Sequence, residues 1–213
     1  MSPIELSAWA CLKCLQAVLI FRMAQLRLFG KLPCFATYLI LSLFSSAVLF
    51  TVGQSAYATT WIWLTPAILL ALAATVLETH WKIQHHCRPL KHPNTATSLM
   101  AGVSALICWF TLEAHAWTSH LKPAFFGTRY VTGVLAIWML WHTAWFPRID
   151  PPLPSNLLNH GRILAVFLCI QVGIFAAINL LAPYAPRELL SCLNMGGQAL
   201  CLCVWIVSLR REK

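Results

Sequence analysis

The sequence predicts an all-α integral membrane protein, a polytopic bundle of seven transmembrane helices. Of its 213 residues, 59% are hydrophobic and only 10% are charged, whereas a soluble domain has about 25% charged residues. The hydrophobic residues also form long uninterrupted runs, which excludes the alternating strands of a membrane barrel. We therefore expect residues 1–213 to form a single transmembrane domain, with no soluble catalytic or DNA-binding part.

Seven segments have the length that a spanning helix needs. About 20 apolar residues cross a hydrocarbon core of roughly 30 Å. The segments lie near residues 4–21, 33–52, 60–79, 97–116, 129–147, 162–182 and 189–209. Each is thus predicted to be one transmembrane helix.

The connecting segments are alternately rich and poor in positive charge, and this pattern is an independent test of the predicted number of transmembrane helices. The connections after the first, third and fifth segments are rich in Lys and Arg, those between them are poor, and the chain ends in Arg210, Arg211 and Lys213. Cytoplasmic loops of membrane proteins carry this excess of positive charge. The pattern predicts a protein of the cytoplasmic (inner) membrane of a bacterium, with its amino terminus outside and its carboxyl terminus in the cytoplasm.

The first segment is the least typical span, because Lys13 lies near its middle and a charge there costs a few kcal/mol. No basic region precedes the segment and no clear cleavage site follows it, so we do not expect a removable signal peptide. A helix lying in the membrane interface is the alternative. That alternative leaves six spans and an amino terminus on the cytoplasmic side.

Five polar residues inside the predicted spans are candidates for ligand binding. Polar side chains at this depth usually face the bundle interior and mark a pathway or a binding site. They can equally join neighbouring helices, at about 0.6 kcal/mol each. The candidate ligand-binding residues are Lys13, Gln171, Asn179, Asn194 and Gln198.

Two local features are expected to shape the helices. Gly196 and Gly197 in the last span allow a neighbouring helix to approach closely. Pro66 is expected to kink the third span, with the hydroxyl of Thr65 satisfying the freed backbone group.

The histidines are the most informative residues for function. Six of the eight are predicted at the cytoplasmic side, four of them between Glu78 and His92. Neutral imidazoles suit zinc, copper or iron, and facing helices could hold a haem by axial ligation. The candidate metal-ligating residues are His80, His85, His86 and His142, with His80 and His142 as the haem pair. A simpler interpretation is that they are interfacial polar residues of a basic loop.

The spacings His80–His86 (H-x-x-x-x-H-H) and His115–His120 (H-x-x-x-x-H) resemble the histidine boxes of membrane desaturases and hydroxylases. Those boxes hold two irons. Here the second pair follows the fourth span, on the opposite membrane face, and a third box is missing. Retinal proteins need a lysine in the last span, which has none. We therefore assign the chain to neither group.

Other classes of function lack their residues. The sequence has no G-x-S-x-G, phosphate-binding or dinucleotide-binding motif, and Asp150 is the only aspartate. A nucleic-acid partner is not expected, because the net charge of +9 is spread over short loops; anionic membrane lipid is the expected partner. Cys11 and Cys14 form C-x-x-C, but on a hydrophobic helix we interpret them as small apolar residues rather than a redox or metal pair.

These observations predict a ligand-binding, sensory or complex-subunit role rather than an enzyme. In this hypothesis the bundle holds a lipid or small apolar ligand, and the histidine-rich loop passes its state to a cytoplasmic or membrane protein partner. A small secondary transporter is the alternative, followed by a histidine-ligated membrane metalloprotein. The identity of the ligand and of any cofactor is left open by the sequence.

Overall fold

The computed structural model describes residues 2–86, 122–145, 153–181 and 187–210, and these parts of the chain are helical, with no strand among them. Six helices are described: α1 (Pro3–Gln25), α2 (Pro33–Thr51), α3 (Gln54–His86), α5 (Lys122–Trp145), α6 (Ser155–Leu181) and α7 (Arg187–Ser208). The predicted all-α fold is confirmed for these residues. The fourth predicted span, near 97–116, falls outside them.

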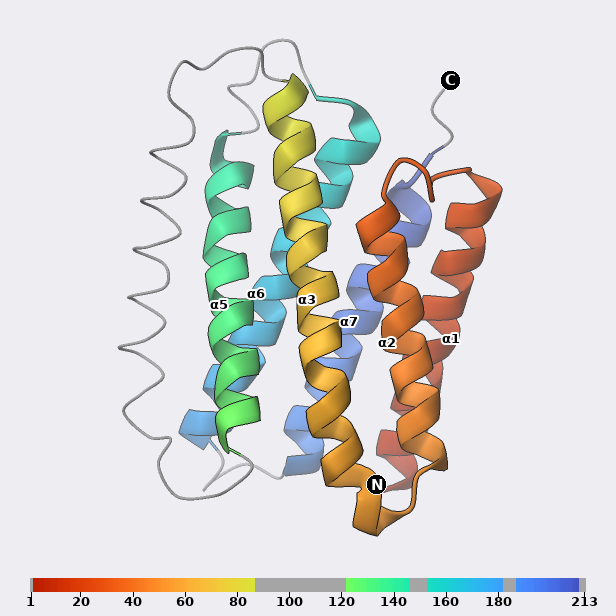
Figure 1. Ribbon diagram of the computed structural model, residues 1–213, viewed down its shortest axis with the longest axis vertical. Coiled ribbons are helices and arrows are strands. Elements are labelled where there is room, and N and C mark those ends of the chain that lie inside the picture. Colours follow the sequence, from red (N-terminus) through yellow and green to blue (C-terminus); the bar gives the residue numbers. More distant parts are fainter. Residues whose placement is uncertain (1, 87–121, 146–152, 182–186, 211–213) are drawn as a thin grey trace.

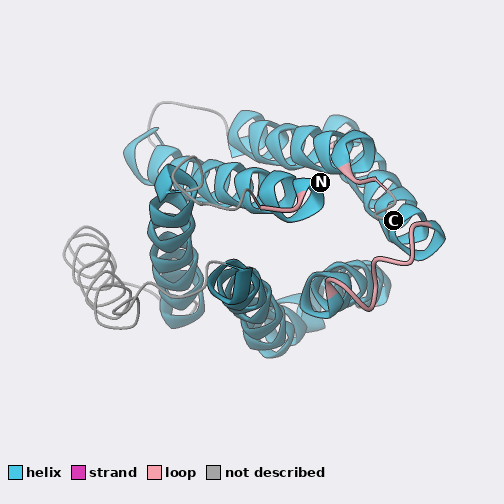
Figure 2. Cartoon of the chain, turned by 90° about the horizontal axis from the view of Figure 1, so that it is seen from above, coloured by secondary structure: helices cyan, strands magenta, loops and turns pink. Residues whose placement is uncertain are grey.

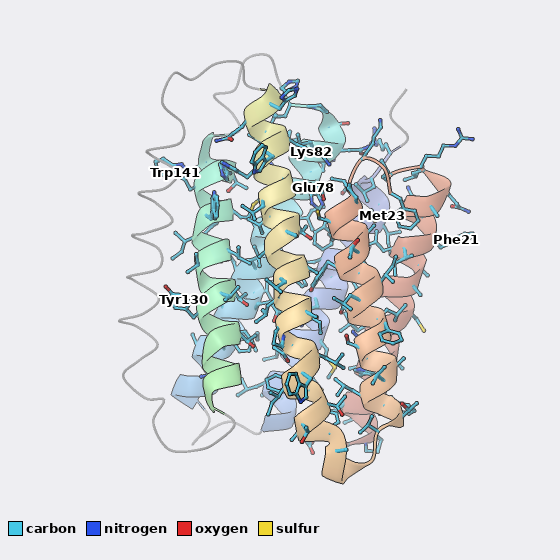
Figure 3. All side chains as sticks on the ribbon, viewed as in Figure 1. Phe21, Met23, Glu78, Lys82, Tyr130 and Trp141 are labelled. Carbon is cyan, nitrogen blue, oxygen red and sulfur yellow. The ribbon has the colours of Figure 1, made fainter. Side chains whose placement is uncertain are left out.

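Five helices are long and apolar enough to cross a membrane: Pro3–Gln25, Pro33–Thr51, Ala56–His86, Ser155–Ala177 and Glu188–Ser208. Large apolar side chains also cover the outside of the bundle, such as Phe21, Leu70 and Val207, each more than 60% exposed. Met23, two residues after Phe21, is fully buried, and Figure 3 shows the two on opposite sides of α1. An apolar exterior around an apolar core indicates a multi-pass membrane protein.

The six helices form a closed ring in which each packs against its neighbours (Figure 2). The order around the ring is α1, α2, α3, α5, α6, α7 and back to α1, with a further contact between α3 and α6. Helices α1, α3, α5 and α7 run in one direction, and α2 and α6 run in the other (Figure 1). The first segment, α1, is therefore a full member of the bundle.

Charge is concentrated at one end of the ring, which we call the basic end. Here α1, α3, α5 and α7 finish and α2 and α6 begin (Figure 1). The described basic side chains that belong to these helix ends and connections are Arg22, Arg27, Lys31, Lys82 and Arg210. We call the other end, where α1 begins, the opposite end.

Helix α3 is longer than the predicted span 60–79. It has 33 residues, which at 1.5 Å per residue is about 50 Å and exceeds the hydrocarbon core. No glycine or proline follows Pro66 before the helix ends at His86, so nothing in the sequence breaks the helix at the membrane boundary. The added turns carry Lys82, His85 and His86 beyond the predicted span.

The predicted role of Thr65 beside Pro66 needs correction. Pro66 lies inside α3 and lacks the N–H that would bond to the carbonyl of Ile62, four residues earlier. The Thr65 hydroxyl donates instead to the carbonyl of Trp61, at 2.7 Å. Thr65 therefore bonds the carbonyl that its own backbone N–H would serve, one residue before the group that the proline frees.

The Gly196–Gly197 packing prediction is confirmed at one of its two positions. A Cβ atom added at Gly197 would lie 2.7 Å from Cγ2 of Ile170 on α6, whereas one added at Gly196 would meet nothing within 4 Å. The α6–α7 interface therefore depends on the missing side chain of Gly197.

Candidate functional site

A cleft of about 670 Å³ opens at the basic end, between the α1–α2 connection, the end of α3 and the start of α6. We call it the basic cleft. One part of its lining is apolar and the other part is basic or polar, and none of the described lining residues is acidic. The apolar lining comes from Leu28, Gly30, Leu32, Trp81, Pro154 and Leu157, and the basic and polar lining from Lys31, Lys82, His85, His86 and Asn156.

Glu78 fixes the wall of this cleft. Its Oε2 atom accepts hydrogen bonds from the backbone N–H groups of Cys34 (2.9 Å) and Phe35 (3.3 Å), in the first turn of α2. The first N–H groups of a helix have no partner within the helix, and the helix dipole favours a negative charge beside them. Glu78 thus ties α3 to the start of α2.

Lys82 lines the cleft and also contacts Glu78. Its Nζ atom lies 2.5 Å from Oε1 of Glu78, one helical turn away, and also donates to the carbonyl of Lys31. An ammonium group has three N–H donors, so one remains for a group in the cleft. Figure 3 shows Glu78 and Lys82 together on the upper part of α3.

Asn156 holds the other wall of the cleft. Its Nδ2 donates to the carbonyl of Arg210 (2.6 Å), and its Oδ1 accepts from the N–H of Arg210 (2.9 Å). Asn156 is only 4% exposed. Arg22 also donates to the neighbouring carbonyl of Leu209, at 3.2 Å. These bonds fix the chain just after α7 to α1 and α6.

The structure brings together two of the four predicted metal-ligating histidines. His80 on α3 and His142 on α5 are buried, with Nδ1 of His80 lying 2.7 Å from Nε2 of His142. The indole N–H of Trp138 donates to the same Nε2 atom at 2.8 Å. Because indole can only donate, His142 Nε2 is an acceptor and His80 Nδ1 carries the proton that points toward it. As predicted, His80 and His142 face each other from two helices, and they are joined directly by a hydrogen bond.

This geometry does not suit the predicted haem ligation. Axial nitrogens lie on opposite sides of an iron, and with metal–nitrogen bonds near 2 Å they are about 4 Å apart. The 2.7 Å separation of His80 and His142 leaves no room for an ion between these atoms. His85 and His86 line the basic cleft instead. Among the described residues, no group of three His, Cys, Asp or Glu side chains could hold a metal ion.

Three of the five predicted ligand-binding residues, Lys13, Asn194 and Gln198, make hydrogen bonds within their own helices. Lys13, which is half-buried, donates to Oε1 of Gln16 at 3.2 Å, and Gln198 donates to Oδ1 of Asn194 at 3.1 Å. Gln171 is half-buried on α6, and the side chain of Asn179 lies outside the described residues. Gln16, a residue that the sequence did not single out, donates to the carbonyl of Leu39 at 2.8 Å and joins α1 to α2.

The two cysteines of the C-x-x-C segment are free thiols. Cys11 and Cys14 are both exposed on α1. Their outward position agrees with the interpretation of small apolar residues on a hydrophobic helix.

Sequence reasoning missed the two residues that shape the basic cleft most directly. In the sequence Glu78 stands out only as the first residue of the histidine-rich segment, although the pair Glu78 and Lys82 at a spacing of four is a helix ion-pair signal. Asn156 carried no recognisable signal, since its partner is the backbone of a residue far along the chain.

Comparisons of the chain with known protein families, with curated proteins and with solved structures give no match.

Proposed function

We propose that this chain is a seven-span protein of the cytoplasmic membrane that binds an anionic amphiphile, such as an inner-leaflet lipid, in the basic cleft. The observation that carries the proposal is the lining of that cleft, which combines two lysines and two histidines with apolar side chains. Ligand pockets of roughly 300–1,000 Å³ are typical of proteins. The cleft is therefore large enough for a headgroup and the adjoining part of an acyl chain.

The direction of the helices supports the seven-span topology. Helix α3 ends at the basic end and α5 begins at the opposite end (Figure 1), so the chain has to return from one end to the other between these two helices. A further span near 97–116 satisfies this requirement. With the basic end in the cytoplasm, as the distribution of positive charge favours, the amino terminus lies outside.

The charges at the cleft support an anionic headgroup. A phosphate accepts strong hydrogen bonds from ammonium groups, and Lys82 has one N–H beyond those that it gives to Glu78 and to the carbonyl of Lys31. Basic residues on the cytoplasmic side also attract anionic lipid by about 1 kcal/mol each. The apolar lining beside them suits the start of an acyl chain.

Ligand binding in this position supports a sensory or complex-subunit role. A phosphate that accepts the third N–H of Lys82 joins the contacts that this side chain makes with Glu78 and with the α1–α2 connection. Occupancy of the cleft therefore alters the surface that the basic end presents to a cytoplasmic or membrane protein partner.

The test is lipid retention measured by native mass spectrometry of the purified protein, with phosphatidylglycerol compared with phosphatidylcholine. Lys31→Gln removes one positive charge from the cleft. Arg27→Asn is its control, because it removes one charge at the same end but outside the cleft lining, and asparagine tolerates the positive φ of 55° at that position.

We expect phosphatidylglycerol to be retained in preference to phosphatidylcholine, and Lys31→Gln to weaken its binding about tenfold, the effect of one charge-assisted hydrogen bond. Arg27→Asn should leave binding nearly unchanged. Equal retention of the two lipids, or an equal loss in both variants, would reduce the interaction to general attraction between a basic surface and the membrane and would contradict the proposal.

A further inference from the structure

One helical turn below the basic cleft, three buried nitrogen atoms have no hydrogen-bond partner among the residues that the structure describes. They are the two ring nitrogens of His160 and the indole nitrogen of Trp205. His160 is 0% exposed and Trp205 is 1% exposed. His160 follows Asn156 by four residues on α6, which places it one turn deeper in the bundle. Buried polar groups in native proteins are nearly all hydrogen-bonded, so an unpartnered group on each of two neighbouring side chains needs an explanation.

The two rings belong to one aromatic cluster, built from three helices. The centroids of His160 on α6 and Trp205 on α7 are 5.9 Å apart. Phe35 on α2 contacts both, at 4.6 Å from His160 and 4.8 Å from Trp205. The rings of His160 and Trp205 are therefore neighbours in the buried interior of the bundle. We call this pair of residues the His160–Trp205 site.

Two polar side chains near the cluster, Glu78 and Asn156, have other partners. The Glu78 carboxylate bonds to the backbone of Cys34 and Phe35 and to Lys82. Asn156 uses its amide on the backbone of Arg210. Neither residue makes a hydrogen bond to His160 or Trp205.

The chemistry of the two rings specifies what can bind. Indole N–H can only donate, and a neutral imidazole has one donor and one acceptor. Satisfying all three nitrogens therefore takes an acceptor for Trp205, an acceptor for the protonated nitrogen of His160 and a donor for its unprotonated nitrogen. An O–H oxygen can fill any of these roles, whereas a carbonyl oxygen or a fully ionised phosphate can only accept and would leave the unprotonated nitrogen of His160 without a partner.

We infer that His160 and Trp205 bind a hydroxyl oxygen inside the bundle. This oxygen comes from one of two sources: a buried water molecule, or a hydroxyl group on the headgroup of an amphiphile in the cleft above. The first source is independent of the proposed function, and the second rests on it.

The test uses the indole N–H resonance of Trp205 in protein labelled with ¹⁵N-tryptophan. Trp205→Phe assigns the resonance, and Trp63→Phe, which removes an indole that is 78% exposed, is the control for the assignment. If Trp205→Phe does not fold, the indole resonance that moves in His160→Gln provides the assignment. Magnetisation transfer to this proton is then measured in delipidated protein, with phosphatidylglycerol, and with phosphatidic acid. Phosphatidic acid lacks the glycerol hydroxyls of the headgroup, and it is used at a pH well above the second pKa of its phosphate, so that the phosphate carries no O–H either.

Transfer from water in delipidated protein supports a bound water. Transfer from the lipid headgroup with phosphatidylglycerol, but not with phosphatidic acid, supports a ligand hydroxyl. The absence of transfer under all three conditions overturns the inference. This measurement concerns only the site beneath the cleft. Transfer can be absent while lipid is still retained and retention still depends on Lys31, which contradicts the inference but not the proposed function. Transfer from water can be present while lipid is not retained, which contradicts the proposed function but not the inference.

Discussion

The basic end and the opposite end of the bundle are stabilised by different kinds of contact. At the basic end, hydrogen bonds join segments that are far apart in the sequence, such as Glu78 with the start of α2 and Asn156 with the chain after α7. At the opposite end, the capping box of Ser2 and Glu5 stays within the first turn of α1. The comparison shows that directional polar contacts are placed where the cleft is, and that they fix the positions of its walls.

The middle of the bundle adds a third kind of contact, which is close apolar packing beside the single Gln16–Leu39 hydrogen bond described between α1 and α2. Helix α7 approaches α6 at Gly197, directly against Ile170. Packing of this kind drives helix association in lipid, where the hydrophobic effect gives no preference for one helix over another. Stability thus comes from close packing along the helices, while the polar contacts determine the geometry of one end.

Glu78→Ala gives the largest expected effect. It removes the acceptor for two backbone N–H groups of α2 and leaves Lys82 without its carboxylate, at a side chain that is 8% exposed. Hydrogen bonds to a charged group contribute about 1.5–3 kcal/mol each, so the free energy of unfolding should fall by about 3 kcal/mol. Denaturant unfolding in detergent, followed by tryptophan fluorescence, measures it.

Glu5→Ala is the matched control, because it removes a carboxylate that caps a helix at the opposite end. Loss of a helix cap costs about 0.5–2 kcal/mol, and Glu5 contributes only half of its capping box. If Glu5→Ala lowered the free energy of unfolding as much as Glu78→Ala does, the two ends of the bundle would not be stabilised by different kinds of contact.

Gly197→Ala is expected to have the next largest effect. The new methyl group would lie 2.7 Å from Cγ2 of Ile170, a β-branched side chain with little freedom to turn. Overpacking costs typically about 1–3 kcal/mol, so the apparent Tm in detergent should fall. Gly196→Ala, which meets nothing within 4 Å, should leave stability unchanged or raise it slightly, since alanine favours helix.

A double-mutant cycle tests whether Ile170 is the cause. Ile170→Ala removes the clashing carbon, so Gly197→Ala should cost less in that background than in the wild type. Costs that simply add would mean that α6 and α7 do not meet at this pair of residues.

The helices themselves were largely predictable from the sequence, because long apolar runs determine where a chain can cross lipid. The helix ends were less predictable: α5 and α6 each begin seven residues before their predicted spans, and α3 extends past its span at both ends, with Lys82, His85 and His86 in its last turns. An apolar run marks only the part of a helix that lies in the membrane, whereas the helix itself continues until a residue breaks it. The cleft depends on those additional turns, so its position could not be read from the predicted span.

The level at which the site residues lie along the bundle could be predicted from the sequence, but the residues that they contact could not. His80 and His142 were placed at the same level from span lengths alone, and they are in contact. That contact also depends on the rotation of α3 and α5 about their axes and on their being neighbours in the ring. For the same reason the partners of Glu78 and His160 were not predictable, since Cys34 and Trp205 are brought to them by helices distant in the sequence.

Asn156→Ala is expected to have the smallest effect, because its two hydrogen bonds to the backbone of Arg210 are uncharged. Such bonds contribute about 0.5–1.5 kcal/mol each, so the unfolding free energy should fall by about 1–2 kcal/mol. The substitution should loosen the structure only locally. Amide hydrogen exchange at Leu209 and Arg210 should become faster, while exchange in the middle of α6 stays slow.

Asn156→Asp separates the two bonds. The carboxylate can still accept from the N–H of Arg210 but cannot donate to its carbonyl, so exchange after α7 should lie between that of the wild type and that of Asn156→Ala. If both variants instead accelerate exchange throughout α6 and α7, the contact supports the whole bundle. The polar contacts of the basic end would then be part of general helix packing rather than a separate device that shapes the cleft.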